Sequence, residues 1–400
     1  MSSTSFRIRK AVVLIAIVFS SAFAGAWLAS LVEVFLGQIE YAVPPLYVVF
    51  PVLSVIAFFS MLAHEAGHVL GGRLAKFEFV LLVAGPLKIA RVGSRLVCRY
   101  NKWLQMGGGL VLSVPRNRLA KQRDLFFFTA GGPCASLAMA CAFMVLANAL
   151  YHGLAAHPVQ GYTVYFVIFG ALFNGGIAVI TLLPLPATGI DNDGKLLVDL
   201  MRGGRKAEIK LLGQLLSTKG VQGMRPGEWP QNEVQRLLFL TSEQEGKYAI
   251  MARLTAFYHF LDLKDIASAA ACIQWIKPRV ESTPPHIQAA LQIEVCFFEA
   301  LFTTATDINA DCLIMNKKGY MNKKGYVAKH TLARVESAML YRSGQFERGI
   351  ARAQEGIRLA EKGVLQAGIA KIEIEWMQTV IANCTSPLSA PNEKHGLPVK

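Results

Sequence analysis

Charged side chains are missing from long parts of this 400-residue sequence. Asp, Glu, Lys and Arg make up 17% of the chain, whereas hydrophobic residues make up 53%. A helix needs about 20 residues to cross a bilayer core. Uncharged stretches of about this length cover residues 11–32, 41–62, about 125–150 and about 163–186. This composition argues against a purely soluble protein and predicts four transmembrane helices.

The first of these stretches has two interpretations. The preceding RIRK and the small residues around AFAGA are also typical of a signal peptide. The apolar run at 11–32 is, however, longer than the roughly 7–15 residues usual in such a peptide. We therefore expect residues 1–40 to form a retained N-terminal transmembrane segment.

Cysteine is scarce and scattered. The seven cysteines are odd in number and include no C-x-x-C pair. This pattern excludes a disulfide framework and a cysteine-ligated zinc site as organising features. We expect the thiols to be reduced and mostly structural.

Basic residues outnumber acidic ones and give a net charge of +14. Residues 71–124 contain 11 Lys or Arg, whereas the stretches at 33–40 and 151–162 contain none. Because Lys and Arg accumulate in cytoplasmic loops, we expect residues 71–124 and both termini on the cytoplasmic side. This compact multi-pass pattern favours a bacterial inner membrane. The basic excess then reflects orientation in a lipid bilayer, and no nucleic-acid partner is expected.

The second uncharged stretch leads directly into the sequence HEAGH, where His64, Glu65 and His68 form an H-E-x-x-H motif. On a helix, residues i and i+4 lie one turn apart on the same face, so both imidazoles can bind one metal ion. Glu65 is placed to act as a general base on bound water. Ionisable side chains are costly at the end of a membrane span and usually mark function there. The motif therefore predicts a catalytic site with a single Zn²⁺.

A catalytic zinc site needs a third protein ligand. The best source is TLLPLPATGIDNDGKLL, residues 181–197, at the end of the fourth uncharged stretch. The second and fourth spans both run inward, so this segment and HEAGH should emerge at the same cytoplasmic membrane edge. Asp191 and Asp193 are both candidates for the third ligand.

These motifs together resemble the site-2 protease family of intramembrane zinc metalloproteases. The resemblance covers about residues 41–200 and implies a three-helix metalloprotease core. It implies that His64, His68 and Asp193 hold zinc and that Glu65 is the catalytic base, because Asp193 and Gly194 match the family's Asp-Gly pair. TAGGPCAS, residues 129–136, resembles the family's A-G-P-x-x-N element on the middle core helix.

The sequence departs from that family at two positions. Ser136 stands where the family usually has asparagine, and Thr181 begins a T-x-x-P in place of N-x-x-P, with Pro184 retained. Asn174 is a candidate for the missing polar group, binding the substrate or a developing oxyanion. A hydrogen bond between helices is the alternative role for Asn174. We expect Asn174, Thr181 and Pro184 to contribute to substrate binding.

The basic loop at 71–124 contains short strand patterns at 77–90, 94–100 and 106–114. These predict a small β-hairpin insertion within the core. Its edge is either a site for pairing with an extended substrate or a cover with no substrate contact.

From residue 201 onward, helical periodicity replaces long apolar runs. Residues 201–385 are expected to form a cytoplasmic all-helical domain, and residues 386–400 a disordered tail. The predicted helices are 195–217, 231–241, 243–262, 264–280, 285–305, 330–343, 345–362 and 366–384. Residues 338–360, and more weakly 258–276, resemble tetratricopeptide-type helical hairpins, which stack to bury their apolar faces. A protein partner is expected on this domain.

The sequence thus predicts a mainly α-helical polytopic membrane protein with four spans and a cytoplasmic helical domain. Its predicted function is zinc-dependent hydrolysis of peptide bonds in a transmembrane protein or membrane-associated peptide. The main alternative is a non-catalytic membrane adaptor, or pseudoprotease, that acts through the helical domain. A transporter is a third alternative, but the four predicted spans have no visible internal repeat to support it.

Overall fold

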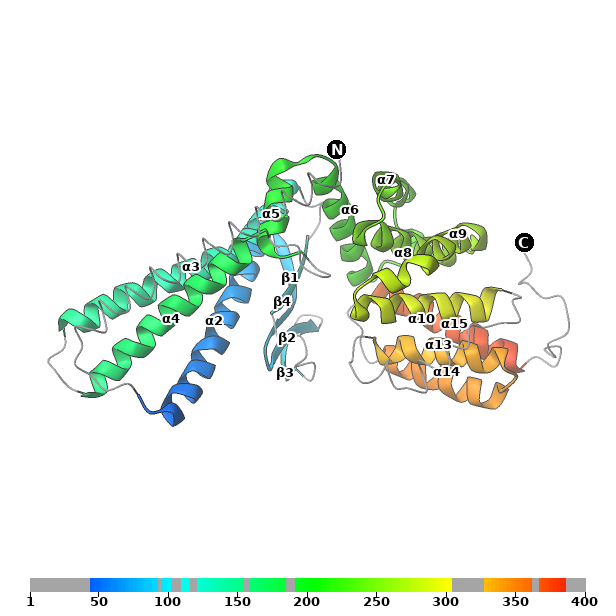
Figure 1. The fold of residues 1–400 in the computed structure, drawn as a ribbon. Coiled ribbons are helices and arrows are strands. Elements are labelled where there is room, and N and C mark those ends of the chain that lie inside the picture. Colours follow the sequence, from blue (N-terminus) through cyan, green and yellow to red (C-terminus); the bar gives the residue numbers. More distant parts are fainter. Residues whose placement is uncertain are drawn as a thin grey trace. The chain divides into compact units, whose positions relative to one another are not determined.

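The structure is a computed structural model, and the ranges it describes are 44–92, 95–101, 109–115, 121–153, 158–184, 191–303, 327–361 and 367–385. The described chain is mostly helical, with one small antiparallel sheet (Figure 1). Its contacts define two compact units: residues 1–64 with 134–179, and residues 65–133 with 180–400.

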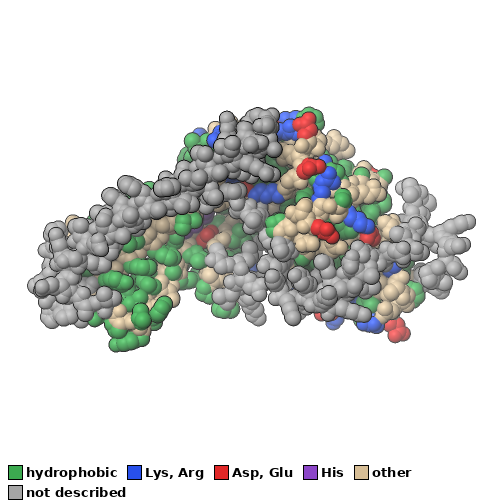
Figure 2. All heavy atoms as spheres, viewed as in Figure 1, with side chains coloured by type: hydrophobic (Ala, Val, Ile, Leu, Met, Phe, Trp, Pro, Cys, Tyr) green, Lys and Arg blue, Asp and Glu red, His purple; other side chains and the backbone are tan. Residues whose placement is uncertain are grey.

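Three described helices are long and apolar enough to cross a membrane: α2 (Leu46–Leu74), α3 (Gln122–Gly153) and α4 (Pro158–Leu182). Each follows from an uncharged stretch of the sequence, whereas the stretch at 11–32 lies outside the described residues. Large apolar side chains of α2, including Tyr47, Phe50 and Phe59, are more than half exposed. Hydrophobic side chains gather over the described part of these helices (Figure 2). Such faces are suited to contact with lipid, which indicates that the protein associates with a membrane.

The sheet follows α2 in the chain and lies within the second unit. Its strands run in the order β3-β2-β1-β4, and all neighbours are antiparallel. The three predicted strand regions are confirmed, with the first divided by a turn at Gly85, whose φ of 50° suits glycine. The strands are β1 (Phe77–Ala84), β2 (Leu87–Val92), β3 (Arg95–Tyr100) and β4 (Leu110–Pro115).

The remaining described chain is helical and closely follows the predicted helices. The expectation of one helix at 195–217 is wrong, because Gly203 and Gly204 have positive φ values of 64° and 69° and separate α5 from α6. The helices are α5 (Asp193–Arg202), α6 (Gly204–Val221), α7 (Gln231–Thr241), α8 (Lys247–Asp262), α9 (Ile266–Ile276), α10 (Pro285–Phe302), α13 (Lys329–Arg342), α14 (Phe346–Glu361) and α15 (Ala367–Thr385).

Consecutive helices of this region pack as hairpins. α8 packs against α9, α13 packs against α14, and α14 packs against α15 (Figure 1). Phe257, Phe297 and Met377 are fully buried there, and Trp376 is nearly so. The apolar faces of these helices are thus buried against one another, as the two predicted helical hairpins require.

A cluster of buried charges also lies in this region, and we call Arg334, Glu294 and Glu373 the Arg334 cluster. Arg334 is fully buried, and its Nη2 lies 2.7 Å from Glu294 Oε1. On its other side, Nε lies 3.4 Å from Glu373 Oε1. Tyr258 donates a 2.7 Å hydrogen bond to Glu294, and His330 Nε2 lies 3.1 Å from Glu373. Each buried charge therefore has an opposite charge beside it.

Within the described ranges, the cysteines follow the expectation with one exception. Cys98, Cys134, Cys141, Cys272 and Cys384 are free thiols. Cys296 in α10 is disulfide-bonded, which corrects the expectation for that residue. Burial raises the pKa of the Cys272 thiol to about 11, so this thiol is unreactive at neutral pH.

Candidate metal centre

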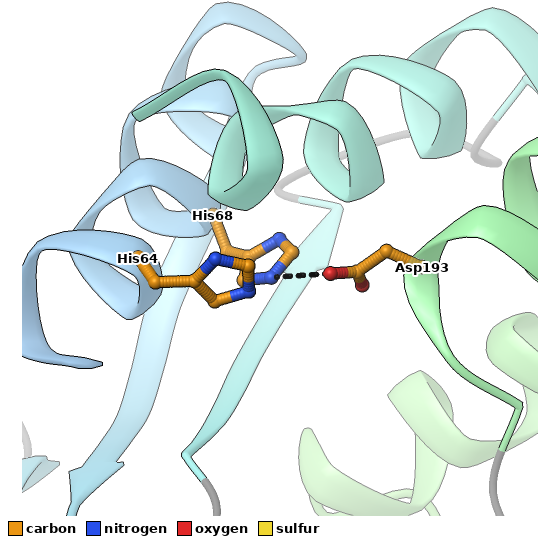
Figure 3. Close-up of side chains that lie close together, drawn as sticks. All are labelled: His64, His68 and Asp193. Atoms are coloured by element: carbon orange, nitrogen blue, oxygen red, sulfur yellow. Dashed lines mark ion pairs between the residues drawn. The ribbon is translucent and has the colours of Figure 1, made fainter. Parts of the chain in front are cut away.

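His64 and His68 lie one turn apart on α2, and both side chains are buried. Asp193 is the first residue of α5. One ligand atom from each of these three residues can be chosen so that all lie within 4.8 Å of one another. Both imidazoles and the Asp193 carboxylate face a common space (Figure 3). The structure thus brings together residues that are 129 positions apart, counted from His64 to Asp193.

The contacts of the imidazole Nδ1 atoms orient both rings. His68 Nδ1 lies 2.9 Å from the carbonyl oxygen of Phe128. Because a carbonyl only accepts hydrogen bonds, this Nδ1 carries the proton, and in a neutral ring Nε2 then has the lone pair. His64 Nδ1 lies 2.9 Å from the hydroxyl of Ser136, which is fully buried. Metal-binding histidines use such contacts to fix their tautomer and orientation.

The donor set fits a zinc ion. Two imidazole nitrogens and one carboxylate oxygen are three of the ligand types that Zn²⁺ prefers, and a catalytic site leaves a fourth position for water. His68 Nε2 and Asp193 Oδ2 are 3.5 Å apart. Two tetrahedral ligands at zinc distances of about 2 Å would be roughly 3.3 Å apart. The observed spacing of this pair is therefore close to that of two zinc ligands.

Glycines allow the close helix contact that places His68 beside α3. A Cβ on Gly71 would lie 2.2 Å from the carbonyl oxygen of Phe127. A Cβ on Gly131 would likewise lie 2.2 Å from the carbonyl oxygen of Gly67. Both contacts are far too short for a side chain, so the two backbones approach each other because the side chains are absent. This approach brings the neighbouring Phe128 carbonyl within hydrogen-bond distance of His68.

Local capping fixes the position of Asp193. Asn192 is the N-cap of α5, and its Oδ1 accepts a 3.0 Å hydrogen bond from the Lys195 amide. The Asn192 amide group donates to the carbonyl of Leu183, just beyond α4. A Cβ on Gly194 would lie 1.9 Å from the Leu182 carbonyl oxygen, so position 194 must be glycine. The structure therefore explains why glycine follows Asp193: the end of α4 packs directly against the start of α5.

Glu65 is buried and lies against the chain just before β4. A Cβ on Gly109 would be 1.8 Å from Glu65 Oε1. Any side chain at position 109 would therefore displace the carboxylate of Glu65. This contact gives Gly109 a role that the strand pattern did not indicate.

Asp191, the competing candidate ligand, has a different environment. Its carboxylate accepts hydrogen bonds from Lys247 and Tyr248, and its Oδ2 lies 2.8 Å from Lys210 Nζ. Burial raises the pKa of Asp191, but the hydrogen bonds outweigh this and hold the pKa well below its ordinary value. Among the described residues, the grouping of metal-ligand types contains Asp193 and not Asp191.

The expected substrate-binding residues lie on or just after α4. The buried Asn174 donates 2.8 Å hydrogen bonds to the Ser60 hydroxyl of α2 and to the Gly170 carbonyl. The first bond matches the interhelical alternative, and a substrate contact stays a prediction. Thr181 is half-buried in the last turn of α4, and Pro184 is exposed beyond it.

A cavity of about 970 Å³ lies within the second unit. Its lining is mainly apolar and comes largely from α6, α8 and α15. Phe128 and Asp191 also line it. The cavity therefore adjoins both the residue that orients His68 and the segment that carries Asp193.

Several contributors were not identified from the sequence as parts of the site. Ser136 was noted as a departure from a motif, whereas its hydroxyl lies beside His64. A hydroxyl within an apolar span was the available signal. The role of the Phe128 carbonyl could not be found from the sequence, because every residue has a backbone carbonyl.

Comparisons with models of protein families, with curated proteins and with solved structures find no match to this chain.

Proposed function

We propose that this chain is an intramembrane zinc metalloprotease of the site-2 protease type. The observation that carries the proposal is the convergence of His64 and His68, near the end of the apolar helix α2, with Asp193 at the start of α5. Ionisable side chains are rare at such places unless they have a function. The donor set and the adjacent glutamate match those of zinc hydrolases.

In this mechanism His64, His68 and Asp193 would hold zinc, and the bound ion would act as a Lewis acid that lowers the pKa of water. Glu65 accepts a proton from the attacking water, and Gly109 leaves room for its carboxylate. Ser136 and the Phe128 carbonyl keep both imidazoles oriented for the ion.

The substrate is a transmembrane protein or a membrane-associated peptide. A helix shields its carbonyls, so the scissile segment must unwind before attack, and helix-breaking residues should promote cleavage. The apolar cavity beside Phe128 and Asp191 offers a place for an apolar flank of that segment. Asn174, Thr181 and Pro184 are the proposed substrate contacts on α4.

The proposed topology has four spans, including residues 11–32, with both termini in the cytoplasm of a bacterial cell. The support comes from loop charges, since 11 Lys or Arg lie in residues 71–124. On this topology the metal centre lies near the cytoplasmic membrane edge, and residues 201–385 form a cytoplasmic domain.

The decisive experiment replaces Glu65 with Gln. Loss of the base should lower cleavage by about 10²–10⁴-fold while zinc stays bound. The probe is a tagged single-span membrane protein, with proline and glycine near the cytoplasmic end of its span, reconstituted with the purified enzyme. Zinc content is measured on the same samples.

Glu78→Gln is the matched control, because Glu78 lies on β1 and is paired with Arg91 at the surface. It should cleave like the unmodified protein. If Glu65→Gln also cleaved normally, the protease proposal would be wrong and the non-catalytic adaptor would replace it.

A further inference from the structure

Asp191 belongs to a cluster of charges that joins the metal-ligand segment to the helices that follow it. We call Asp191, Asp199, Lys210, Lys247 and Tyr248 the Asp191 clamp. Lys210 Nζ, on α6, lies 2.8 Å from Asp191 Oδ2 and 2.7 Å from Asp199 Oδ2. Lys247 and Tyr248, at the start of α8, also bond to Asp191. One short segment is thus held by two helices from further along the chain.

The clamp is largely buried, which makes its contacts strong. The side chains of Lys210 and Asp199 are only 7% and 2% exposed, and that of Asp191 is 12% exposed. A buried ammonium group is stable only beside compensating charge, and Lys210 has a carboxylate on each side. Removing one carboxylate leaves this charge half compensated and loosens the segment.

The clamp holds the chain on both sides of Asp193. Asp191 lies two residues before Asp193, and Asp199 lies six residues after it on α5. Both carboxylates bond to the same lysine of α6. Between them, Asn192 caps α5 and bonds to the Leu183 carbonyl. The start of α5, and therefore the Asp193 carboxylate, is fixed from the helical region as well as from α4.

We propose that Asp191 is a positioning residue for the zinc site and that Lys210, Lys247 and Tyr248 of the helical region complete that site through it. This inference rests on the proposed function, because it assigns Asp193 as the zinc ligand. It also gives the helical region a role beyond partner binding, since α6 and α8 set the geometry of a metal ligand.

The test measures zinc affinity by competition with a chelator, using full-length protein in the Glu65→Gln background. Asp193→Asn should abolish specific zinc binding. Asp191→Asn should retain the site but weaken zinc about 10–100-fold, as loss of a supporting contact does at other metal sites. Tyr248→Phe removes one hydrogen bond at constant shape, so it should fold and weaken zinc by a smaller factor. Asp191→Asn and Tyr248→Phe should be less than additive, because they act through the same carboxylate.

The control for general destabilisation is Arg225→Met. Arg225 pairs with Asp262 and Glu375 elsewhere in the helical region. This variant should lower the unfolding temperature but leave zinc affinity unchanged. If Arg225→Met weakened zinc as much as Asp191→Asn did, the specific role of the clamp would be refuted.

The outcomes separate this inference from the proposed function. Loss of zinc in Asp193→Asn with normal binding in both Asp191→Asn and Tyr248→Phe overturns the positioning role alone. Loss of zinc in Asp191→Asn but not in Asp193→Asn makes Asp191 the ligand and overturns both assignments. Normal zinc binding in all three variants removes the proposed zinc site itself.

Discussion

Two buried clusters of ionisable side chains lie in different regions of this molecule, and their composition differs. The metal centre combines two imidazoles and a carboxylate whose ligand atoms lie within 4.8 Å of one another. The Arg334 cluster combines a fully buried guanidinium with carboxylates on two sides. The first is a set of metal-ligand types, whereas the second contains its own cation.

The contacts that support the two clusters also differ. At the metal centre, the Ser136 hydroxyl contacts Nδ1 of His64, and the Phe128 carbonyl contacts Nδ1 of His68. Each ring is therefore oriented through its Nδ1 atom. In the Arg334 cluster, supporting residues reinforce the existing ion pairs: Tyr258 donates to Glu294, and Thr331 donates a 3.0 Å hydrogen bond to Glu373. Burial of charge therefore does not by itself indicate function. The type of donor and the direction of its contacts distinguish a binding site from a structural ion pair.

The largest effect on folding is expected from Arg334→Met. This change leaves Glu294 and Glu373 buried without their guanidinium, which should cost about 3–5 kcal/mol of unfolding free energy. Tryptophan fluorescence during urea unfolding measures it, because Trp229, Trp275 and Trp376 lie in the helical region. Zinc affinity, by contrast, should be preserved at low urea.

Arg236→Met is the matched control for that prediction. Arg236 pairs with Glu208 at 2.7 Å, but both side chains are more than 40% exposed. Exposed pairs contribute about 1 kcal/mol or less. Equal losses of unfolding free energy in the two variants would show that the Arg334 cluster stabilises the fold no more than an exposed ion pair does.

The sequence predicts elements well where a local pattern determines them. The uncharged runs predict α2, α3 and α4, and the apolar residues around Gly85 predict β1 and β2. The break between α5 and α6 was missed because a single glycine pair can also lie within a helix. Here the pair adopts positive φ, which only the three-dimensional path of the chain requires.

Within the candidate site, the sequence indicates the ligand types but not their supports. His64 and His68 are identifiable because their four-residue spacing is a property of one helix. Two partners of Asp191, Lys247 and Tyr248, lie 56 and 57 residues away, in a helix that no motif connects to the aspartate. The choice between Asp191 and Asp193 depends on this tertiary contact, so local spacing alone left it open.

A smaller effect is expected from Ser136→Ala, and it should affect only the metal centre. Removing the hydroxyl leaves His64 Nδ1 without its 2.9 Å contact, so the ring is less well oriented. Zinc affinity should fall about 10–100-fold, measured by chelator competition, while urea unfolding of the helical region is unchanged. Ser54→Ala is the control, since its hydroxyl bonds to the Phe50 carbonyl of its own helix. Equal zinc affinity in the two variants would exclude the orienting role of Ser136.

The smallest effect is a pH dependence confined to the Arg334 cluster. Burial raises the pKa of Glu373, but Arg334 and the hydrogen bonds from His330 and Thr331 lower it more, so the folded pKa lies below its ordinary value. Ionised Glu373 therefore stabilises the fold above the unfolded pKa of about 4.3, and this contribution is lost as pH falls through the folded value. Glu373→Gln lacks this contribution at every pH. The urea midpoints of the two proteins should thus begin to converge as pH falls to the unfolded pKa of about 4.3, and they should converge further as pH falls through the lower, folded pKa. A constant gap would mean that Glu373 stays ionised throughout or contributes only by packing.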